Sequence, residues 1–179
     1  MNRSWLSYIF ILVMLLCQPI CVSAQSYSGD CGNDTTWNLN TETGQLVISG
    51  NGKVTSSPWK NYKNQIKNVI IENGVLELPN SAFAYCINLE NVVLGNGVTS
   101  TGNYAFSGCS KLSDIQIGNS VKRISTCSFD NCSSLTQVVI PNSVITIDGG
   151  AFGYCNTLES VEFGNGITSI GNYAFSGCS

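Results

Sequence analysis

The chain contains no histidine, and only 11% of its 179 residues are charged. Without histidine it lacks the usual general base, the serine triad and most zinc ligand sets. Its 9 cysteines include no Cys-x-x-Cys pair, so that zinc and redox motif is missing as well. With 8 basic against 11 acidic side chains the net charge is −3, which does not attract nucleic acid. We therefore expect no nucleic-acid partner, no metal site and no cofactor.

A short pattern recurs every 23 residues: a small residue, a phenylalanine, two variable residues and a cysteine. A fixed period of about 20 to 50 residues predicts a solenoid, because each unit can bury its apolar side only against its neighbours. The copies are Ala82-Phe83 to Cys86, Ala105-Phe106 to Cys109, Ser128-Phe129 to Cys132, Ala151-Phe152 to Cys155 and Ala174-Phe175 to Cys178.

Each unit carries a predicted strand whose inner residues are two positions apart and therefore face the same way. These pairs are Val69 and Ile71, Val92 and Leu94, Ile115 and Ile117, Val138 and Ile140, and Val161 and Phe163. An asparagine follows each strand and indicates a corner, because asparagine tolerates left-handed backbone. The corner residues are Asn73, Asn96, Asn119, Asn142 and Asn165.

After each corner we expect a second, shorter extended stretch and then one helical turn that buries the phenylalanine. The inner position of the second stretch is apolar in four units, whereas Thr101 departs from the rule in the other. The phenylalanines should stack as the spine of the core. The five periodic cysteines should form a ladder of buried free thiols, while Cys31 and Cys127 lie outside it and could pair or remain free.

The run Leu-x-x-Val-x-Ile-Pro-Asn-Ser-Val-x-x-Ile-x-x-x-Ala-Phe-x-x-Cys, from Leu135 to Cys155, resembles the BspA-like (treponemal type) leucine-rich repeat. The resemblance covers about residues 66–179. It implies a bacterial surface or secreted protein of a kind associated with adhesion to host proteins and other cells, without catalytic residues or a cofactor. The expected fold is a β-rich α/β solenoid: a leucine-rich repeat stack of 23-residue units with parallel strands, short helical turns and an N-terminal β-hairpin cap.

Residues 1–24 have the composition of a secretory signal peptide, with Arg3, an apolar run from Leu6 to Leu16, and small residues before position 25. The run is too short for a membrane span. We therefore expect export to the cell surface or the medium, with no membrane span after cleavage.

Residues 25–65 break the period and are expected to form the N-terminal cap, and residues 66–179 the solenoid of about five units, the last incomplete. Alternating apolar residues around Thr41 to Gly44 predict a β-hairpin. Ser57 and Pro58 predict the start of a short helix that carries Trp59 and Tyr62.

Stacking the predicted strands aligns their outward residues in two columns, which we call the outer strip. An apolar strip on an exposed sheet suggests protein binding, although β-branched residues also simply favour strands. One column is Ile70, Val93, Gln116, Val139 and Glu162, and the other is Asn68, Asn91, Asp114, Gln137 and Ser160.

Three other interpretations remain open. A carbohydrate-binding or carbohydrate-active solenoid would need outer aromatics, for which Tyr85, Tyr104, Tyr154 and Tyr173 are the recurrent candidates. We expect no enzyme, because Glu159 and Glu162 should point to opposite faces of a strand. The chain could also be a non-functional fragment of a longer repeat protein, or it could self-associate through an uncapped C-terminal repeat.

Overall fold

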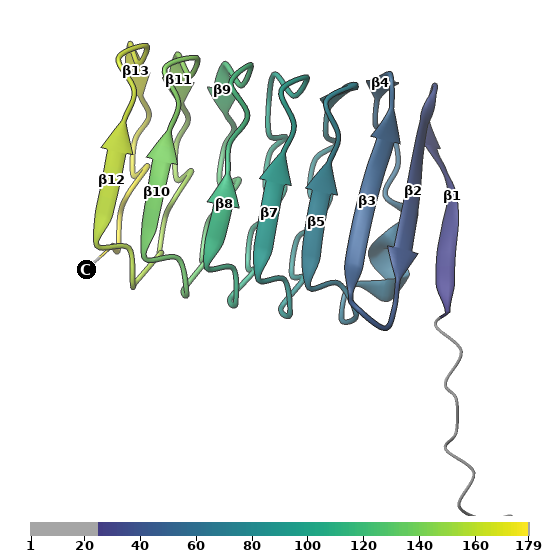
Figure 1. Ribbon diagram of the computed structural model, residues 1–179. Helices are drawn as coiled ribbons and strands as arrows, with labels where there is room; N and C mark the ends of the chain where they lie inside the picture. Colours follow the sequence, from purple (N-terminus) through teal and green to yellow (C-terminus); the bar gives the residue numbers. More distant parts are fainter. Residues whose placement is uncertain (1–24, 179) are drawn as a thin grey trace, which may run out of the picture.

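Parallel strands stand side by side in the order of the repeats, as Figure 1 shows for residues 25–178, which the computed structural model describes. The six-stranded main sheet has the order β1-β2-β3-β5-β7-β8. Its strands are β1 (Ser26–Gly32), β2 (Thr35–Asn40), β3 (Gln45–Gly50), β5 (Asn68–Ile71), β7 (Asn91–Leu94) and β8 (Asp114–Gln116). The next two strands in the row, β10 (Gln137–Ile140) and β12 (Ser160–Phe163), form a separate two-stranded sheet.

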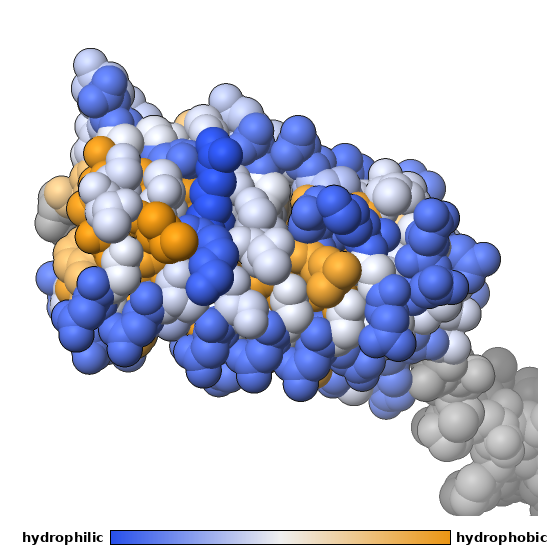
Figure 2. Space-filling view, turned by 90° about the horizontal axis from the view of Figure 1, so that it is seen from above, coloured by the Kyte–Doolittle hydropathy of each residue, from blue (hydrophilic) through white to orange (hydrophobic). Residues whose placement is uncertain are grey.

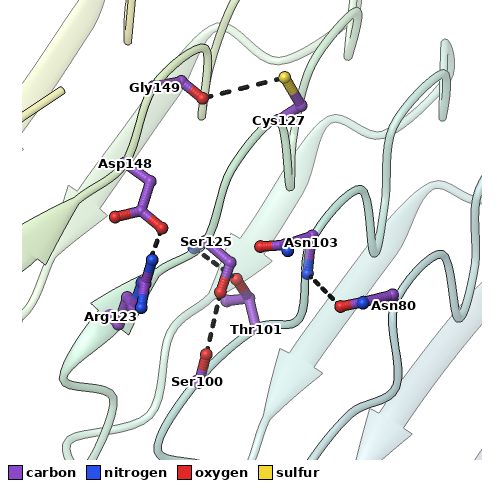
Figure 3. Close-up of polar contacts among 9 residues, drawn as sticks. All are labelled: Asn80, Ser100, Thr101, Asn103, Arg123, Ser125, Cys127, Asp148 and Gly149. Carbon is purple, nitrogen blue, oxygen red and sulfur yellow. Dashed lines mark hydrogen bonds and ion pairs between the residues drawn. The ribbon is translucent and has the colours of Figure 1, made fainter. Parts of the chain in front are cut away.

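A second layer follows the corners. Its strands are β4 (Gly52–Lys53), β6 (Val75–Glu77), β9 (Arg123–Ile124), β11 (Thr146–Ile147) and β13 (Ser169–Ile170). The strands β13, β11 and β9 pair in parallel, and single bridges through Ser100 join them to β6. Thr101 follows Leu78 in this layer's inner column and is fully buried. Its Oγ1 accepts a hydrogen bond from the backbone N–H of Ser125 at 2.9 Å, so its polar group is paired (Figure 3).

The phenylalanines form the predicted spine. Phe83, Phe106, Phe129 and Phe152 are almost completely buried, and neighbouring rings from Phe83 to Phe175 lie 5.1 to 5.3 Å apart, nearly parallel. Parallel in-register strands place every equivalent side chain directly over the last, which is why the 23-residue period produces one continuous stack.

The α/β part of the expected fold is not confirmed, because the described residues contain a single helix, the 3-10 helix at Pro58–Tyr62. Each Ala-Phe-x-x-Cys segment is a tight turn instead of a helical turn. Two positions per turn have left-handed backbone, with φ of 50 to 76°. A residue in this conformation cannot continue a right-handed helical turn, so the turn ends there. These positions are Ser81 and Tyr85, Tyr104 and Gly108, Cys127 and Asn131, Gly150 and Tyr154, and Tyr173 and Gly177.

The turns bond to one another along the solenoid. The N–H of each phenylalanine donates to the carbonyl that precedes the next phenylalanine, as from Phe106 to Ser128 at 2.8 Å. The cysteine thiols add a second link: the Sγ of Cys132 donates to the carbonyl of Phe106 at 3.4 Å, and Cys109, Cys155 and Cys178 repeat this contact. All seven cysteines in residues 25–178 are free. A buried thiol therefore serves both as a small apolar group and as a donor.

Burial raises the pKa of the Cys86 and Cys155 thiols to about 12, from the ordinary value of 9.0. The folded protein therefore keeps protons that the unfolded chain loses above pH 9.0, and stability should fall as the pH rises from there towards about 12. Urea midpoints at about pH 8 and about pH 10.5 measure this, with the variant Cys86→Ala, Cys155→Ala for comparison. We expect a smaller alkaline loss in the variant; an identical loss would show that other groups cause it.

The N-terminal region contains the predicted hairpin, in which β2 and β3 pair antiparallel. Its description as a separate cap is not confirmed, because β3 also pairs in parallel with β5 and is thus a regular member of the main sheet. Ser57 precedes the 3-10 helix but makes no side-chain capping bond. Trp59 is fully buried and stacks on Phe83 at 5.3 Å, so it begins the aromatic spine.

Candidate functional site

The ten residues of the outer strip lie on one side of the main-sheet strands, opposite the buried core residues. The strand register aligns them as predicted: Asn68 with Asn91 and Asp114, Ile70 with Val93 and Gln116, Gln137 with Ser160, and Val139 with Glu162. Their neighbours along each strand, such as Val69 and Val92, are buried. The alternation of inner and outer residues thus follows the two-residue period of a strand.

The outer strip is not continuous, because no strand pairing joins β8 to β10. Within residues 25–178, the second layer and the turns still bond across this point, for example from Ile145 N–H to Lys122 O and from Phe129 N–H to Ala151 O. The repeats that contain β8 and β10 are therefore held together at the second layer and the turns but separated at the outer strip. We call this feature the sheet break.

One residue of the repeat that contains β10 accounts for the sheet break. Pro141 has no N–H, whereas Glu72 and Gly164 at equivalent positions donate to the carbonyls of Ile48 and Ile140. Ser143 stands where Gly97 and Gly166 stand in other repeats, but a serine alone does not separate corners: Ser120 occupies the same position beside β8, and that corner still bonds to Asn96.

The corner asparagines act as structural groups. The side-chain oxygens of Asn73, Asn96 and Asn142 accept hydrogen bonds from the next corner's N–H at 2.8 to 2.9 Å. This ladder is interrupted between Asn119 and Asn142, at the sheet break. The asparagine column therefore fixes the corners and offers no regular ligand site.

Exposure of the outer strip increases towards the later repeats. Ile70 and Val93 are half-buried by their neighbours, whereas Val139 is 57% exposed. From β8 onward all six members of the strip are exposed. The apolar character is therefore densest on β5 and β7, and the most accessible apolar side chain is on β10.

Sequence reasoning missed two members of the strip. Gln45 and Val47 on β3 continue the two columns, since they align with Asn68 and Ile70. The alternation of Val47 with buried Leu46 and Ile48 indicates an outward position, but residues 45–50 lie outside the 23-residue period from which the columns are predicted. Val47, Ile70 and Val93 thus form a row of three apolar residues on adjacent strands.

The face formed by the second layer differs from the outer strip. Viewed from above, it is largely hydrophilic, with hydrophobic patches separated by hydrophilic side chains (Figure 2). Its charged groups pair locally: Lys53 contacts Glu77 at 2.9 Å, and Arg123 contacts Asp148 at 2.6 Å (Figure 3). Its exposed large apolar side chains are Leu76 and Ile145, which are 43% and 44% exposed, and Ile170 on the last strand.

The recurrent tyrosines have a packing role. A Cβ at Gly108 would lie 2.6 Å from the ring of Tyr85, and one at Gly177 would lie 2.9 Å from the ring of Tyr154. Each of these rings therefore lies against the glycine of the following repeat. The arrangement explains why a glycine follows Tyr85 and Tyr154 one period later, at Gly108 and Gly177.

In the described residues no group of three or more acidic, cysteine or histidine side chains is arranged to hold a metal ion. Over the same residues, no helix reaches the length and apolarity that a membrane span requires.

Comparison with known proteins gives results of two kinds. A family model described as "BspA type Leucine rich repeat region" matches residues 56–179 in 6 copies. Among solved structures, the chain is similar to a leucine-rich repeat protein of T. pallidum, with 26% identity and a TM-score of 0.62 over 82% of this chain and 66% of that one. It is also similar to a leucine-rich cell surface protein of Faecalibacterium prausnitzii, with 28% identity and a TM-score of 0.63.

The second alignment covers 87% of this chain and 47% of the F. prausnitzii protein. The chain thus spans about two thirds of the first of these proteins and about half of the second. A search of curated protein sequences finds no significant match.

Proposed function

This chain belongs to the BspA-type leucine-rich repeat family, and on that premise we propose that it is an exported bacterial surface protein that binds another protein through the outer strip. The proposed role is adhesion to host or other cells. Export rests on the composition of residues 1–24, and a similar solved structure is that of a cell surface protein.

The row of apolar side chains on adjacent strands is the observation that supports this proposal. Val47, Ile70 and Val93 lie side by side on β3, β5 and β7 and point away from the core. The second layer has no equivalent row, since Leu76 and Ile145 belong to repeats that are three periods apart. An apolar row on a flat sheet offers a partner buried area with little ordering of the binding surface.

The test is a pair of charge substitutions in the outer strip. Val93→Glu combined with Val139→Glu should lower binding to immobilised extracellular-matrix proteins, or to intact cells, by about 100-fold or more. Each buried carboxylate would remain unpaired in the interface, at a cost of several kcal/mol. Binding is measured by surface plasmon resonance, with circular dichroism to establish that the fold is retained.

The matched control makes the same chemical change on the other face. Leu76→Glu with Ile145→Glu changes two exposed apolar positions and adds the same charge. We expect its binding to stay within about twofold of the parent protein. Equal losses in both double variants would indicate a general charge effect, and retained binding in the Val93 and Val139 variant would refute a role for the outer strip.

Self-association through the last repeat stays a separate prediction. Size-exclusion chromatography with light scattering on residues 25–179 measures the molar mass directly. A concentration-dependent dimer would support the prediction, and a monomer at all concentrations would refute it.

A further inference from the structure

The sheet break opens a cleft in the outer strip. It has a volume of about 900 Å³ and lies between β8 and β10, with β12 on its far side. Gln116, Val139 and Pro141 contribute to its walls, together with Asn119 and Ser143 at the corner. A cavity of this size falls in the range of small-ligand and peptide sites, about 300 to 1,000 Å³.

Hydrogen-bonding groups in the cleft are left without partners. The Oγ of Ser143 is buried and makes no hydrogen bond. The corner ladder joins Asn96 to Asn119 and Asn142 to Asn165. The side-chain oxygen of Asn119 accepts no such bond from the N–H of Asn142. The facing edges of β8 and β10 also lack the ladder of bonds that joins β7 to β8. Asn119 is exposed to solvent, whereas the Ser143 Oγ is buried. A buried polar group is normally paired, so the Ser143 Oγ marks a point in the cleft where a ligand can bond.

The charges of the cleft specify the chemistry of that ligand. Asp114 and Glu162 are its only charged lining residues, and both are acidic. Val139 supplies an exposed apolar surface between them in the strip. Arginine and lysine side chains combine an aliphatic stem with a cationic donor group, and both parts would be matched here.

We propose that the cleft at the sheet break binds an extended peptide segment of a partner protein that carries a basic residue. The basic side chain lies along Val139 and donates to Asp114 or Glu162, and the peptide main chain lies across the mouth of the cleft. This inference rests on the proposed function, since it places the partner's anchoring segment within the outer strip.

The probe for this inference is a fluorescent peptide of sequence Val-Arg-Val-Arg-Val, with blocked ends, measured by fluorescence anisotropy. Asp114→Asn with Glu162→Gln should weaken its binding by about tenfold or more, because charge-assisted hydrogen bonds are lost. The control Glu90→Gln with Glu159→Gln removes two exposed carboxylates outside the cleft and should change binding by less than about twofold. A probe with Glu in place of Arg should not bind.

A second variant tests the sheet break itself. Pro141→Gly with Ser143→Gly converts the corner to the Gly-Asn-Gly sequence of residues 95–97 and 164–166. It restores an N–H opposite the carbonyl of Ile117 and removes the Ser143 hydroxyl that is unpaired in the cleft. We expect the pairing of β8 with β10 to form and probe binding to fall by about tenfold, while Pro79→Gly, a proline change outside the cleft, leaves binding unchanged.

The outcomes separate this inference from the proposed function. Absence of probe binding, or equal affinity in the Asp114 and Glu90 double variants, would overturn the inference. Val93 lies outside the cleft, so Val93→Glu alone tests the outer strip. If Val93→Glu abolishes partner binding while the probe does not bind, the outer strip remains and the cleft is rejected. If the probe binds in the cleft while partner binding survives Val93→Glu, the apolar row of Val47, Ile70 and Val93 is rejected as the binding surface and the cleft remains.

Discussion

Replacing Phe106 by alanine should lower the free energy of unfolding by about 3–5 kcal/mol, as is usual for a fully buried aromatic side chain. Its ring lies 5.1 Å from Phe83 and 5.2 Å from Phe129, so the substitution leaves a cavity between two other rings. Neither neighbour can move into the gap, because in-register hydrogen bonds fix the spacing of the repeats. Urea denaturation followed by circular dichroism measures the change.

The same substitution at Phe175 is the comparison. Phe175 is only partly buried and has a stacked neighbour on one side, Phe152. We expect Phe175→Ala to cost about a third as much as Phe106→Ala, since less apolar surface is exposed to water. Equal costs at the two positions would contradict the account of the spine as a continuous stack.

Trp59→Ala should have an effect of similar size, about 3–5 kcal/mol. Trp59 is the largest fully buried side chain, it stacks on Phe83, and its Nε1 donates to the carbonyl of Ala82 at 2.8 Å. Truncation therefore removes both the apolar contact at the start of the spine and the partner of a buried carbonyl. Thermal unfolding and urea titration both report this change.

Trp59→Phe separates the two contributions. Phenylalanine keeps a ring in the stack but cannot donate to the Ala82 carbonyl, so a smaller loss of about 1–2 kcal/mol is expected. If Trp59→Phe were as destabilising as Trp59→Ala, the hydrogen bond and not the stacking would dominate at this position.

Strict periodicity made the repeat architecture predictable from sequence. A 23-residue interval fixes which residues meet, so the strands, the stacked phenylalanines and the buried cysteines all followed from spacing alone. The turns did not, because four tyrosines occupy left-handed positions that bulky residues rarely adopt. Tyr85, Tyr104 and Tyr154 donate backbone hydrogen bonds to the next repeat, and the rings of Tyr85 and Tyr154 also contact its glycine. Both kinds of contact are properties of the stack.

The outer strip was predictable for the same reason, since outward positions alternate with the buried ones. The sheet break was not. Proline is an ordinary corner residue when read within one repeat, and its effect depends on the carbonyl of Ile117 in the repeat before. Only the stacked structure shows that Pro141 stands where β8 and β10 do not pair.

Site-specific photo-cross-linking would test the central claim, that the outer strip contacts the partner, most directly. A photoreactive phenylalanine analogue is placed at Val93 in one protein and at Leu76 in another, and each is irradiated on cells or matrix proteins that the parent protein binds. The account predicts a cross-linked partner from Val93 on the outer strip and none from Leu76 on the opposite face. Cross-linking from Leu76 without cross-linking from Val93 would contradict it.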